Sequence, residues 1–472
     1  MSATPVIAVF DIGKTNKKLL LFNEDYDVVL EESASFEETT DEEGFPCEDV
    51  DVLTSWILRH VQLLGQSKTF DVKAINFSTY GASLVYIDAN GKRLAPLYNY
   101  LKTYPDDVLK RFHQAHGDKE RIAVETSSPV MGHLNAGLQL YWFKHQRPEL
   151  FSQLHAVLHF PQYLSYQLTG RLVAEMTNVG CHSAMWNFHN RTYHDWLRKE
   201  EIDTRLMPVV HGNQAVKISN AENADVAVGV GLHDSSAAII PYLLSFSEPF
   251  VIVSTGTWTI TLNPFNNELP AAHDLNNGCL SYLTYDGNPV KVSMLFSGHD
   301  HQQQLDRIAA YFNVETQYLQ SLAYNHEWRQ TLKVDADADE IISNTYRALT
   351  PTDPCVFHLR ELSRYQSPAQ AYHQLIIDLI GRQKDAINAV MSGGNIQNMY
   401  VDGGFCKNSI YMQVLSDAFP HINVFASSMK QGTALGAALA IHNEWNQKKL
   451  PDTLIRLKPW HKTDSGDHTT ER

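Results

Sequence analysis

The sequence lacks paired cysteines, long apolar runs and an excess of basic residues. The five cysteines are widely spaced with no CxxC pair, which argues against a disulfide scaffold or a zinc site and favours reduced thiols. No secretory apolar region and no membrane-length apolar run occurs, so we expect a cytoplasmic protein that neither enters nor spans a membrane. The formal net charge of −15 argues against a sequence-independent nucleic-acid binder.

The length and the ordinary apolar content indicate a globular chain of more than one domain. With 472 residues, the chain is too long for a single hydrophobic core. Its 43% apolar and 19% charged residues exclude a disordered protein. We expect an N-terminal domain over 1–245, a C-terminal domain over 246–460 and a polar tail over 461–472.

Three short β-branched apolar runs each lead into a turn that contains glycine. The runs and turns cover 6–16, 251–258 and 399–405, and a related element, Gly231-Leu-His-Asp-Ser-Ser-Ala237, precedes the second of them. A buried strand that ends in Gly with Ser or Thr presents N–H groups and hydroxyls at one point, as a phosphate chain requires. Two such turns nearly 250 residues apart indicate a nucleotide held between two related domains.

The pattern around the first turn predicts a hairpin. The apolar run resumes directly after Asn16, so a Walker A loop, which opens a helix, is excluded. The run 84–88 is expected to pair with the strand at 74–78, and 105–200 is mostly helical by pattern. Further strands are expected at 6–10, 17–22, 27–30, 225–231 and 399–402, and a strand, turn and strand over 251–262 repeat the pattern of 6–22. Further helices are expected at 49–64, 235–242, 368–391, 409–418 and 432–443.

The order of these motifs resembles the FGGY family of sugar kinases, within the actin/Hsp70/hexokinase-like ATPase superfamily. The resemblance covers residues 6–445, and its most specific motifs are His233-Asp-Ser-Ser236 and Ser254-Thr-Gly-Thr-Trp258. Among the subfamilies, the chain most resembles rhamnulokinase and fuculokinase, and the segment 159–178 resembles the family's segment between the sugar pocket and the hinge.

The resemblance implies an α/β fold of two actin-like (ribonuclease H-like) domains around a central cleft. Each domain would hold a mixed five-stranded sheet with flanking helices. ATP with Mg²⁺ would bind on the C-terminal side of the cleft and a small sugar on the N-terminal side, with no nucleic-acid partner. Many relatives form dimers, so the resemblance also implies a homodimer.

The resemblance assigns roles to residues at matching positions. Asp234 matches the general base that takes the proton from the sugar hydroxyl, and Asp11 matches the carboxylate that organises Mg²⁺. The nucleotide would be bound by residues of the three turns, namely Gly13, Thr15, Asn16, Lys18, Ser254, Thr255, Gly256, Thr257, Gly403, Gly404 and Asn408.

Three departures from the family pattern concern the choice of sugar. Ser83 stands where close relatives carry an Asp, Leu101-Lys102 replaces an Arg-Asp pair, and Lys14 replaces a small residue. A pocket without a buried carboxylate loses an acceptor for two hydroxyls, which changes specificity. We therefore expect a remodelled sugar pocket formed by Tyr80, Ser83, Lys102 and His133 together with Asp234.

Structural alternatives exist for several of these residues. Asp234 could be a helix N-cap, and Asp11 could cap a turn. We expect Trp258 to be a core residue and His233 to be a structural partner rather than a second base. His299-Asp-His301 is expected to be an exposed polar turn rather than a metal site.

Other classes of function stay open at this point. An ATP-driven binding module of the Hsp70 or actin type would share the phosphate turns but would need no base such as Asp234. A degenerate kinase that serves as a sugar sensor is suggested by the altered sugar segment, whereas the retained Asp234 and both phosphate turns argue against it. Among kinases, a pentulose kinase of the xylulokinase or ribulokinase type is the alternative to a deoxyhexulose kinase.

Overall fold

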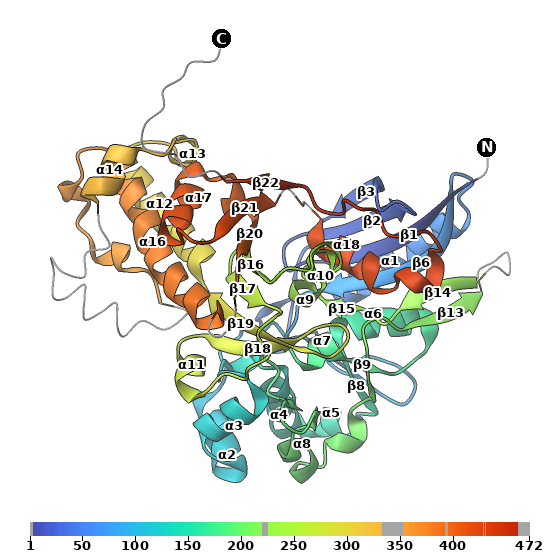
Figure 1. Cartoon of the computed structure of the whole chain (residues 1–472). Coiled ribbons are helices and arrows are strands. Elements are labelled where there is room, and N and C mark those ends of the chain that lie inside the picture. The colour runs from blue at the N-terminus through green and yellow to red at the C-terminus, as the bar shows by residue number, and fades with distance from the viewer. Residues whose placement is uncertain are drawn as a thin grey trace.

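Two large mixed sheets organise the chain in the computed structural model (Figure 1). The structure describes residues 3–219, 225–332, 353–391, 395–427, 429 and 431–460. The predicted tail at 461–472 lies outside these residues. No helix in the described ranges is both long enough and apolar enough to cross a membrane.

The first sheet is built from the N-terminal half of the chain. Its strand order is β13-β14-β6-β1-β2-β3, with β15 also paired to β6. The strands β1 and β2 are antiparallel, while β1 and β6 are parallel. Their bounds are β1 Thr4–Ile12, β2 Lys17–Asn23, β3 Val28–Ala34, β6 Phe70–Thr79, β13 Ala215–Ser219, β14 Asp225–Gly229 and β15 Leu232–His233.

The second sheet repeats the same arrangement. Its strand order is β18-β19-β17-β16-β20-β21-β22, again with an antiparallel hairpin, β16–β17, beside a parallel pair, β16–β20. The bounds are β16 Phe250–Thr255, β17 Thr259–Asn263, β18 Cys279–Leu283, β19 Pro289–Leu295, β20 Asn398–Gly403, β21 Asn423–Ser427 and β22 Leu457–Pro459.

A common five-strand core is recognisable in both sheets, and each sheet is wider than the expected five strands. The orders β3-β2-β1-β6-β14 and β19-β17-β16-β20-β21 correspond strand for strand, as in an actin-like fold. Among the described residues each sheet gains two strands: β13 and β15 in the first, β18 and β22 in the second. Three of these added strands continue an edge of the core by antiparallel pairing, with β14, β19 and β21.

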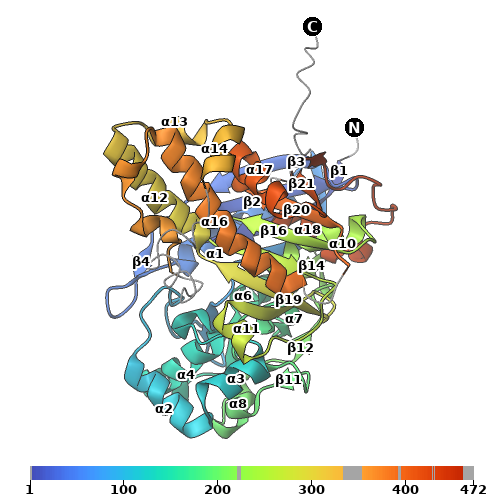
Figure 2. The same ribbon diagram turned by 60° about the vertical axis from the view of Figure 1, so that its left-hand side comes forward.

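Helices cover the second sheet and fill the segment between β7 and β14. In both views α12, α16 and α17 lie together beside the second sheet, and α2, α3, α4 and α8 form a separate group (Figures 1 and 2). The main helices are α1 Val50–Gly65, α2 Asp106–His116, α3 Lys119–Thr126, α4 Ala136–Gln146, α6 Phe160–Thr169, α12 Ser297–Phe312, α16 Pro368–Met391 and α17 Ser409–Ala418.

Short elements complete the described chain. The short helices are α5 Pro148–Ser152, α7 Met176–Val179, α8 Asp195–Lys199, α9 Asp234–Ala237, α10 Ile240–Ser245, α11 Ala272–Asn276, α13 Thr316–Gln320, α14 His326–Thr331 and α19 His442–Trp445. The short strands are β4 Thr39–Thr40, β5 Pro46–Cys47, β9 Ala174–Glu175, β10 Trp186–Asn187, β11 Thr192–Tyr193 and β12 Val209–Val210.

The predicted pairing of 84–88 with the strand at 74–78 is wrong. The strand β7 (Leu84–Ile87) pairs with β8 (Ala156–His159), and Leu84 faces His159 across that two-stranded sheet. Both strands are fully buried, and this pairing buries two apolar strands against each other. The Asn90-Gly91 turn is present, with the Gly91 N–H donated to the Asp88 carbonyl, but it does not join two strands of the main sheet.

Helix α18 (Gly432–Ala440) links the two halves of the molecule. It lies in sequence between β21 and β22 of the second sheet, yet it packs against β1, β6 and α9 of the first half. Its alanines share one buried cluster with Ile7, Val9 and Leu20. Since Gly436 and Ala437 of α18 touch residues of the first half, the end of the chain holds both sheets at one place.

Candidate active site

Both predicted phosphate turns are the tips of β-hairpins. In the first, the N–H of Gly13 donates to the carbonyl of Asn16 over 2.9 Å, and Thr15 and Asn16 are exposed. In the second, the N–H of Gly256 donates to the carbonyl of Trp258 over 3.0 Å, and Gly256 and Thr257 are exposed. The two turns leave polar groups free at equivalent ends of two equivalent hairpins, as a phosphate site requires.

The end of β20 is packed directly against the second turn. Gly403 has φ +87°, and a Cβ there would lie 1.9 Å from the carbonyl oxygen of Thr255. The hydroxyl of Thr255 donates to the Asp402 carbonyl over 2.5 Å and accepts from the N–H of Phe405 over 3.0 Å. Only glycine fits at 403, whereas a Cβ at Gly404 would meet nothing within 4 Å.

A cavity of about 420 Å³ opens beside these glycines. Four of the predicted nucleotide residues line it: Thr255, Gly256, Gly404 and Asn408. The Asn408 side chain donates to the Tyr372 hydroxyl over 2.7 Å, and its oxygen caps α17 by accepting from Tyr411 N–H. The sequence did not identify the remaining wall, which consists of Gly298, His301, Gln320, Tyr372, Phe405 and Lys407.

The expectation of an exposed polar turn at 299–301 is wrong. These residues lie in α12, and Asp300 and His301 are buried. Asp300 accepts from the N–H of Cys355 over 2.6 Å, and the ring of His301 lies 3.1 Å from the Tyr372 hydroxyl. His301 therefore belongs to the wall of the cavity, a role that only the packing of α12 against α16 reveals.

Three carboxylates within the glycine-bearing motifs have strongly raised pKa values. Burial raises the pKa of Asp234 to about 6, although the hydrogen bonds from Ser235 lower it. Burial and the charge of Asp234 raise the pKa of Asp11 to about 6, although the hydrogen bond from Thr433 lowers it. Asp402, which the sequence analysis did not select, has its pKa raised to about 6 by burial.

The carboxylate of Asp11 offers oxygen donors for a hard divalent cation, although among the described residues Asp11, Asp234 and Asp402 do not form one group with metal-binding spacing. Asp11 accepts from the Thr433 hydroxyl over 2.8 Å, and the Asp402 carboxylate lies near Gly432, one residue before Thr433. Oxygen donors of this kind suit Mg²⁺, and a bound cation would relieve the repulsion that raises the pKa of Asp11.

Asp234 begins helix α9 but does not cap it. The N-cap position is His233, and the Asp234 carboxylate accepts from the N–H of the adjacent Ser235 over 2.6 Å. Its side chain is 29% exposed, and its Oδ1 lies 3.3 Å from His233 Nε2. The capping alternative is therefore wrong, and the carboxylate remains open to a ligand.

Lysines near the first turn are held by ion pairs. Lys18 Nζ lies 2.8 Å from Glu31, and Lys14 Nζ lies 2.6 Å from Glu38. Lys17, which is buried, pairs with the buried carboxylate of Glu48 at 2.9 Å.

Lys102 and His133 lie in one buried cluster. Lys102 pairs with Asp41 at 2.5 Å and with Glu43 at 3.1 Å, and its ammonium group lies 5.3 Å from the centre of the Trp142 ring. Burial and the charge of Lys102 lower the pKa of His133 to about 4. Neither ring nitrogen of His133 has a hydrogen-bond partner in the described structure, although the residue is 1% exposed.

Tyr80 and Ser83 form a second group on the strand end after β6. The Tyr80 hydroxyl donates to Glu48 over 3.3 Å, and its ring packs against Phe160 and Tyr100. The Ser83 hydroxyl donates to the carbonyl of Gly81. Among the described residues, no hydrogen bond, ion pair or ring contact joins Tyr80 or Ser83 to the Lys102 cluster. The acidic partners of Lys102, Asp41 and Glu43, could not be identified from the sequence, because acidic runs usually lie on the surface.

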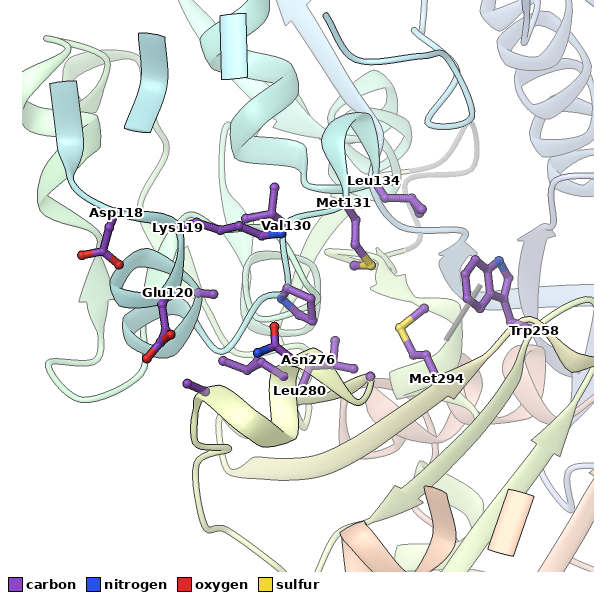
Figure 3. Close-up of a pocket in the computed structure, with 15 residues that line it drawn as sticks. Asp118, Lys119, Glu120, Val130, Met131, Leu134, Trp258, Asn276, Leu280 and Met294 are labelled. Atoms are coloured by element: carbon purple, nitrogen blue, oxygen red, sulfur yellow. The ribbon is translucent and has the colours of Figure 1, made fainter. Parts of the chain in front are cut away.

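A cavity of about 740 Å³ separates the N-terminal helices from the second sheet. Figure 3 shows Val130, Met131 and Leu134 on one side, Leu280 and Met294 on the other, and Trp258 at one end. Trp258 packs on Phe296 and against a buried apolar cluster, as expected of a core residue, but it is only half-buried and also lines this cavity. His133 lies between the lining residues Met131 and Leu134 but is itself buried.

The sequence as a whole matches known proteins along most of its length. The N-terminal domain of the FGGY family of carbohydrate kinases matches residues 6–240, and the C-terminal domain of the same family matches residues 336–442. A rhamnulokinase of Oceanobacillus iheyensis is 21% identical over 457 residues, which are 90% of each chain. A rhamnulokinase of Mannheimia succiniciproducens is 26% identical over 290 residues, and this match spans 57% of each chain.

The fold is also found among solved structures. A ligand-bound xylulose kinase from Lactobacillus acidophilus superposes with a TM-score of 0.75 at 17% identity, covering 94% of this chain and 90% of the other. Together the two domain matches cover most of the described chain, including the hairpin turn with Asp11 and the start of α9 at Asp234. The chain therefore belongs to the FGGY family of carbohydrate kinases and is a phosphotransferase that acts on sugars.

Proposed function

We propose that the chain transfers the γ-phosphate of ATP to a hydroxyl of a ketose, a deoxyhexulose such as L-rhamnulose or L-fuculose. The position of Asp234 carries the proposal. Its charge raises the pKa of Asp11, in the first phosphate turn, and also that of Tyr100, which packs on Tyr80. These interactions support a base that acts near both the phosphate turn and Tyr100, the neighbour of the proposed sugar residue Tyr80.

In this proposal Asp234 is the general base. With a pKa of about 6, it is mostly ionised at pH 7 and can accept the proton of the attacking hydroxyl. The free N–H groups and hydroxyls of the two hairpin tips hold the phosphate chain in line with that hydroxyl. The cavity lined by Gly404, Tyr372 and Asn408 takes the adenosine. Mg²⁺, bound near Asp11, supplies positive charge to the phosphate oxygens.

The sugar is proposed to contact Tyr80, Ser83, Lys102 and His133. The best support is His133, whose buried ring nitrogens have no partner in the described chain, because such a group is costly unless a ligand satisfies it. The identity of the sugar follows the rhamnulokinase relatives, while a pentulose is the alternative suggested by the similar fold of a xylulose kinase.

We also propose 245/246 as the domain boundary, since β15 ends at His233 and β16 begins at Phe250.

A coupled ADP-release assay with ATP and Mg²⁺ tests the function. The panel contains L-rhamnulose, L-fuculose, D- and L-xylulose, L-ribulose and glycerol. Strong stimulation of ADP release by a deoxyhexulose supports the proposal. Stimulation by a pentulose alone would assign a pentulose as the substrate instead. A thermal shift with sugar, but no ADP release with any sugar, would identify a sensor.

The sugar residues need a separate experiment. A Ser83→Ala, His133→Ala double variant should lose most of the sugar-stimulated ADP release while it keeps its ATP affinity. A Ser152→Ala, His155→Ala double variant serves as the matched control, since both residues lie outside the proposed site. Unchanged sugar stimulation in the first double variant would remove Ser83 and His133 from the pocket.

A further inference from the structure

Three potential metal ligands converge beside Asp234. Cys181 and His182 follow α7, and His233 ends β15. One ligand atom from each lies within 4.8 Å of the other two, and all three side chains are buried. Among the described residues, this is the one group of three or more His, Cys, Asp or Glu residues with such spacing. The proposed phosphoryl transfer uses neither Cys181 nor His182.

The distances approach those of a tetrahedral zinc site. Cys181 Sγ lies 3.2 Å from His233 Nε2, and Asp234 Oδ1 lies 3.3 Å from the same nitrogen. Ligands bonded to Zn²⁺ at their usual 2.0–2.3 Å stand about 3.3–3.5 Å apart in a tetrahedron. Two of the ligand separations thus need almost no change, whereas the separations from His182 are at most 4.8 Å and must shorten by up to roughly 1.5 Å. Asp234 lies outside this group of three, so its carboxylate must also turn toward the ion.

The orientation of the histidine rings also suits a metal. His182 Nδ1 lies 2.8 Å from the carbonyl oxygen of Leu134, which can only accept, so this nitrogen carries the proton. In the neutral ring the lone pair is then on Nε2, the nitrogen left for a metal. His233 Nδ1 lies 3.4 Å from the Ser236 hydroxyl, which can accept a hydrogen bond from this nitrogen when Nε2 binds a metal. Such outer hydrogen bonds usually orient metal-binding histidines.

We propose that Cys181, His182 and His233 bind one Zn²⁺ ion, and that the bound ion inhibits the enzyme by taking Asp234 as its fourth ligand. Thiolate and imidazole donors select Zn²⁺ over Mg²⁺, so this site is distinct from the oxygen donors around Asp11. On binding, the Cys181 thiol releases its proton to the buffer and a sulfur–zinc bond forms. Asp234, 29% exposed, is the solvent-facing member of the group.

The inhibitory part rests on the proposed role of Asp234, whereas the binding part does not. A carboxylate bound to Zn²⁺ cannot accept a proton from a sugar hydroxyl, so the ion and catalysis compete for the same oxygen. Binding is therefore measured optically and inhibition is measured separately.

Optical titration of the full-length, reduced protein with Co²⁺ tests the site. We expect one Co²⁺ per chain, a sulfur-to-cobalt charge-transfer band, tetrahedral ligand-field bands, and loss of all bands when one equivalent of Zn²⁺ is added. Cys181→Ser and His182→Asn should each weaken binding at least about 10-fold. Asn suits position 182, where φ is 37°.

Cys406→Ser is the matched control, because Cys406 is half-buried whereas the other four cysteines are buried. It should leave the charge-transfer band unchanged. Absence of the band in the wild-type protein, or its persistence in Cys181→Ser, would overturn the proposal. A band in His182→Asn at wild-type affinity would remove His182 from the site.

The activity measurement compares each variant with its own metal-free rate. One equivalent of Zn²⁺ should abolish most sugar-dependent ADP release in the wild-type protein, while Cys181→Ser should keep most of its metal-free rate. Full activity of the Zn²⁺-loaded wild-type protein would overturn the inhibitory role. Failure of the metal-free protein to phosphorylate any sugar would count against the proposed function, and the cobalt bands would still decide the site.

Discussion

The Thr433 hydroxyl donates a 2.8 Å hydrogen bond to Asp11, a residue 422 positions away. Thr433 lies in the first turn of α18, and Asp11 lies at the end of β1 beside the first phosphate turn. The two glycines of α18 extend the same connection. Gly432 lies near Asp402 of the second sheet, and Gly436 lies against Ala237 of α9. One helix thus contacts the elements that carry Asp11, Asp234 and Asp402.

Asp234→Asn should lower kcat at least about 100-fold, the usual contribution of a positioned base. The amide keeps the size of the side chain and can still accept from Ser235, so the fold should be preserved. Steady-state kinetics gives kcat, and calorimetric titration with ATP should give an unchanged Kd. Full activity of the variant would remove Asp234 from the mechanism.

The rate of sugar phosphorylation should depend on pH through Asp234. Because burial raises its pKa to about 6, the base is protonated below that pH. We expect kcat to fall about tenfold per pH unit well below pH 6 and to be constant above pH 7. A profile of kcat against pH measures this, and a rate that stays level down to pH 4.5 would contradict the assignment.

Asp11→Asn should stabilise the protein in the absence of Mg²⁺ and nucleotide at pH 8. The folded pKa of Asp11, about 6, exceeds its ordinary value of 3.8, so the folded state binds the proton more tightly. The free energy of unfolding therefore falls as pH rises from about 4 to 6, and the loss is complete above pH 6. The amide avoids this loss and still accepts from Thr433.

The measurement is the difference in Tm between Asp11→Asn and wild type. We expect a higher Tm for the variant at pH 8 and a smaller difference near pH 4. Addition of Mg²⁺ and ATP should raise the Tm of the wild type more than that of the variant, which lacks the charge that binds the cation. Equal Tm values of the two proteins at pH 8 would contradict the raised pKa.

Gly403→Ala and Gly404→Ala form a matched pair. At 403 the backbone is left-handed and a Cβ would lie 1.9 Å from the Thr255 carbonyl, so the second phosphate turn must shift and the Tm should fall by several degrees. At 404 nothing lies within 4 Å, so the Tm should change little, and any loss of ATP affinity reports contact with the nucleotide. Equal Tm losses in the two variants would contradict this difference.

The sequence correctly predicted those helices and hairpins that depend on interactions between residues close together in the chain. The β1–β2 hairpin, helix α1, predicted over 49–64, and helix α17, predicted over 409–418, all occur as expected, because turn residues and periodicity act within a few residues. The duplication of the strand and turn at 6–22 and 251–262 also gave the correct two-sheet architecture.

Contacts between distant segments were not predictable. Nothing near Leu84 specifies His159 as its partner, and nothing near Lys102 specifies Asp41. The same holds for Cys181 and His233, 52 positions apart, so the spacing of the cysteines gave no sign of a metal site. These contacts depend on how the helical segment between β7 and β14 folds back, which one sequence does not encode locally.

Gly436→Ala tests whether α18 positions Asp234. A Cβ at 436 would lie 1.8 Å from the carbonyl oxygen of Ala237, the last residue of α9, so the two helices must separate. Since Asp234 begins that single-turn helix, the carboxylate should move with it. Overpacking of this kind usually costs about 1–3 kcal/mol of stability, and a small displacement of a base lowers kcat more than it raises the KM for ATP.

Differential scanning calorimetry and steady-state kinetics measure the two effects. Gly65→Ala, at the end of α1 with nothing within 4 Å, is the control and should change neither. A variant at 436 with reduced Tm but unchanged kcat would show that α18 supports the fold without positioning the base.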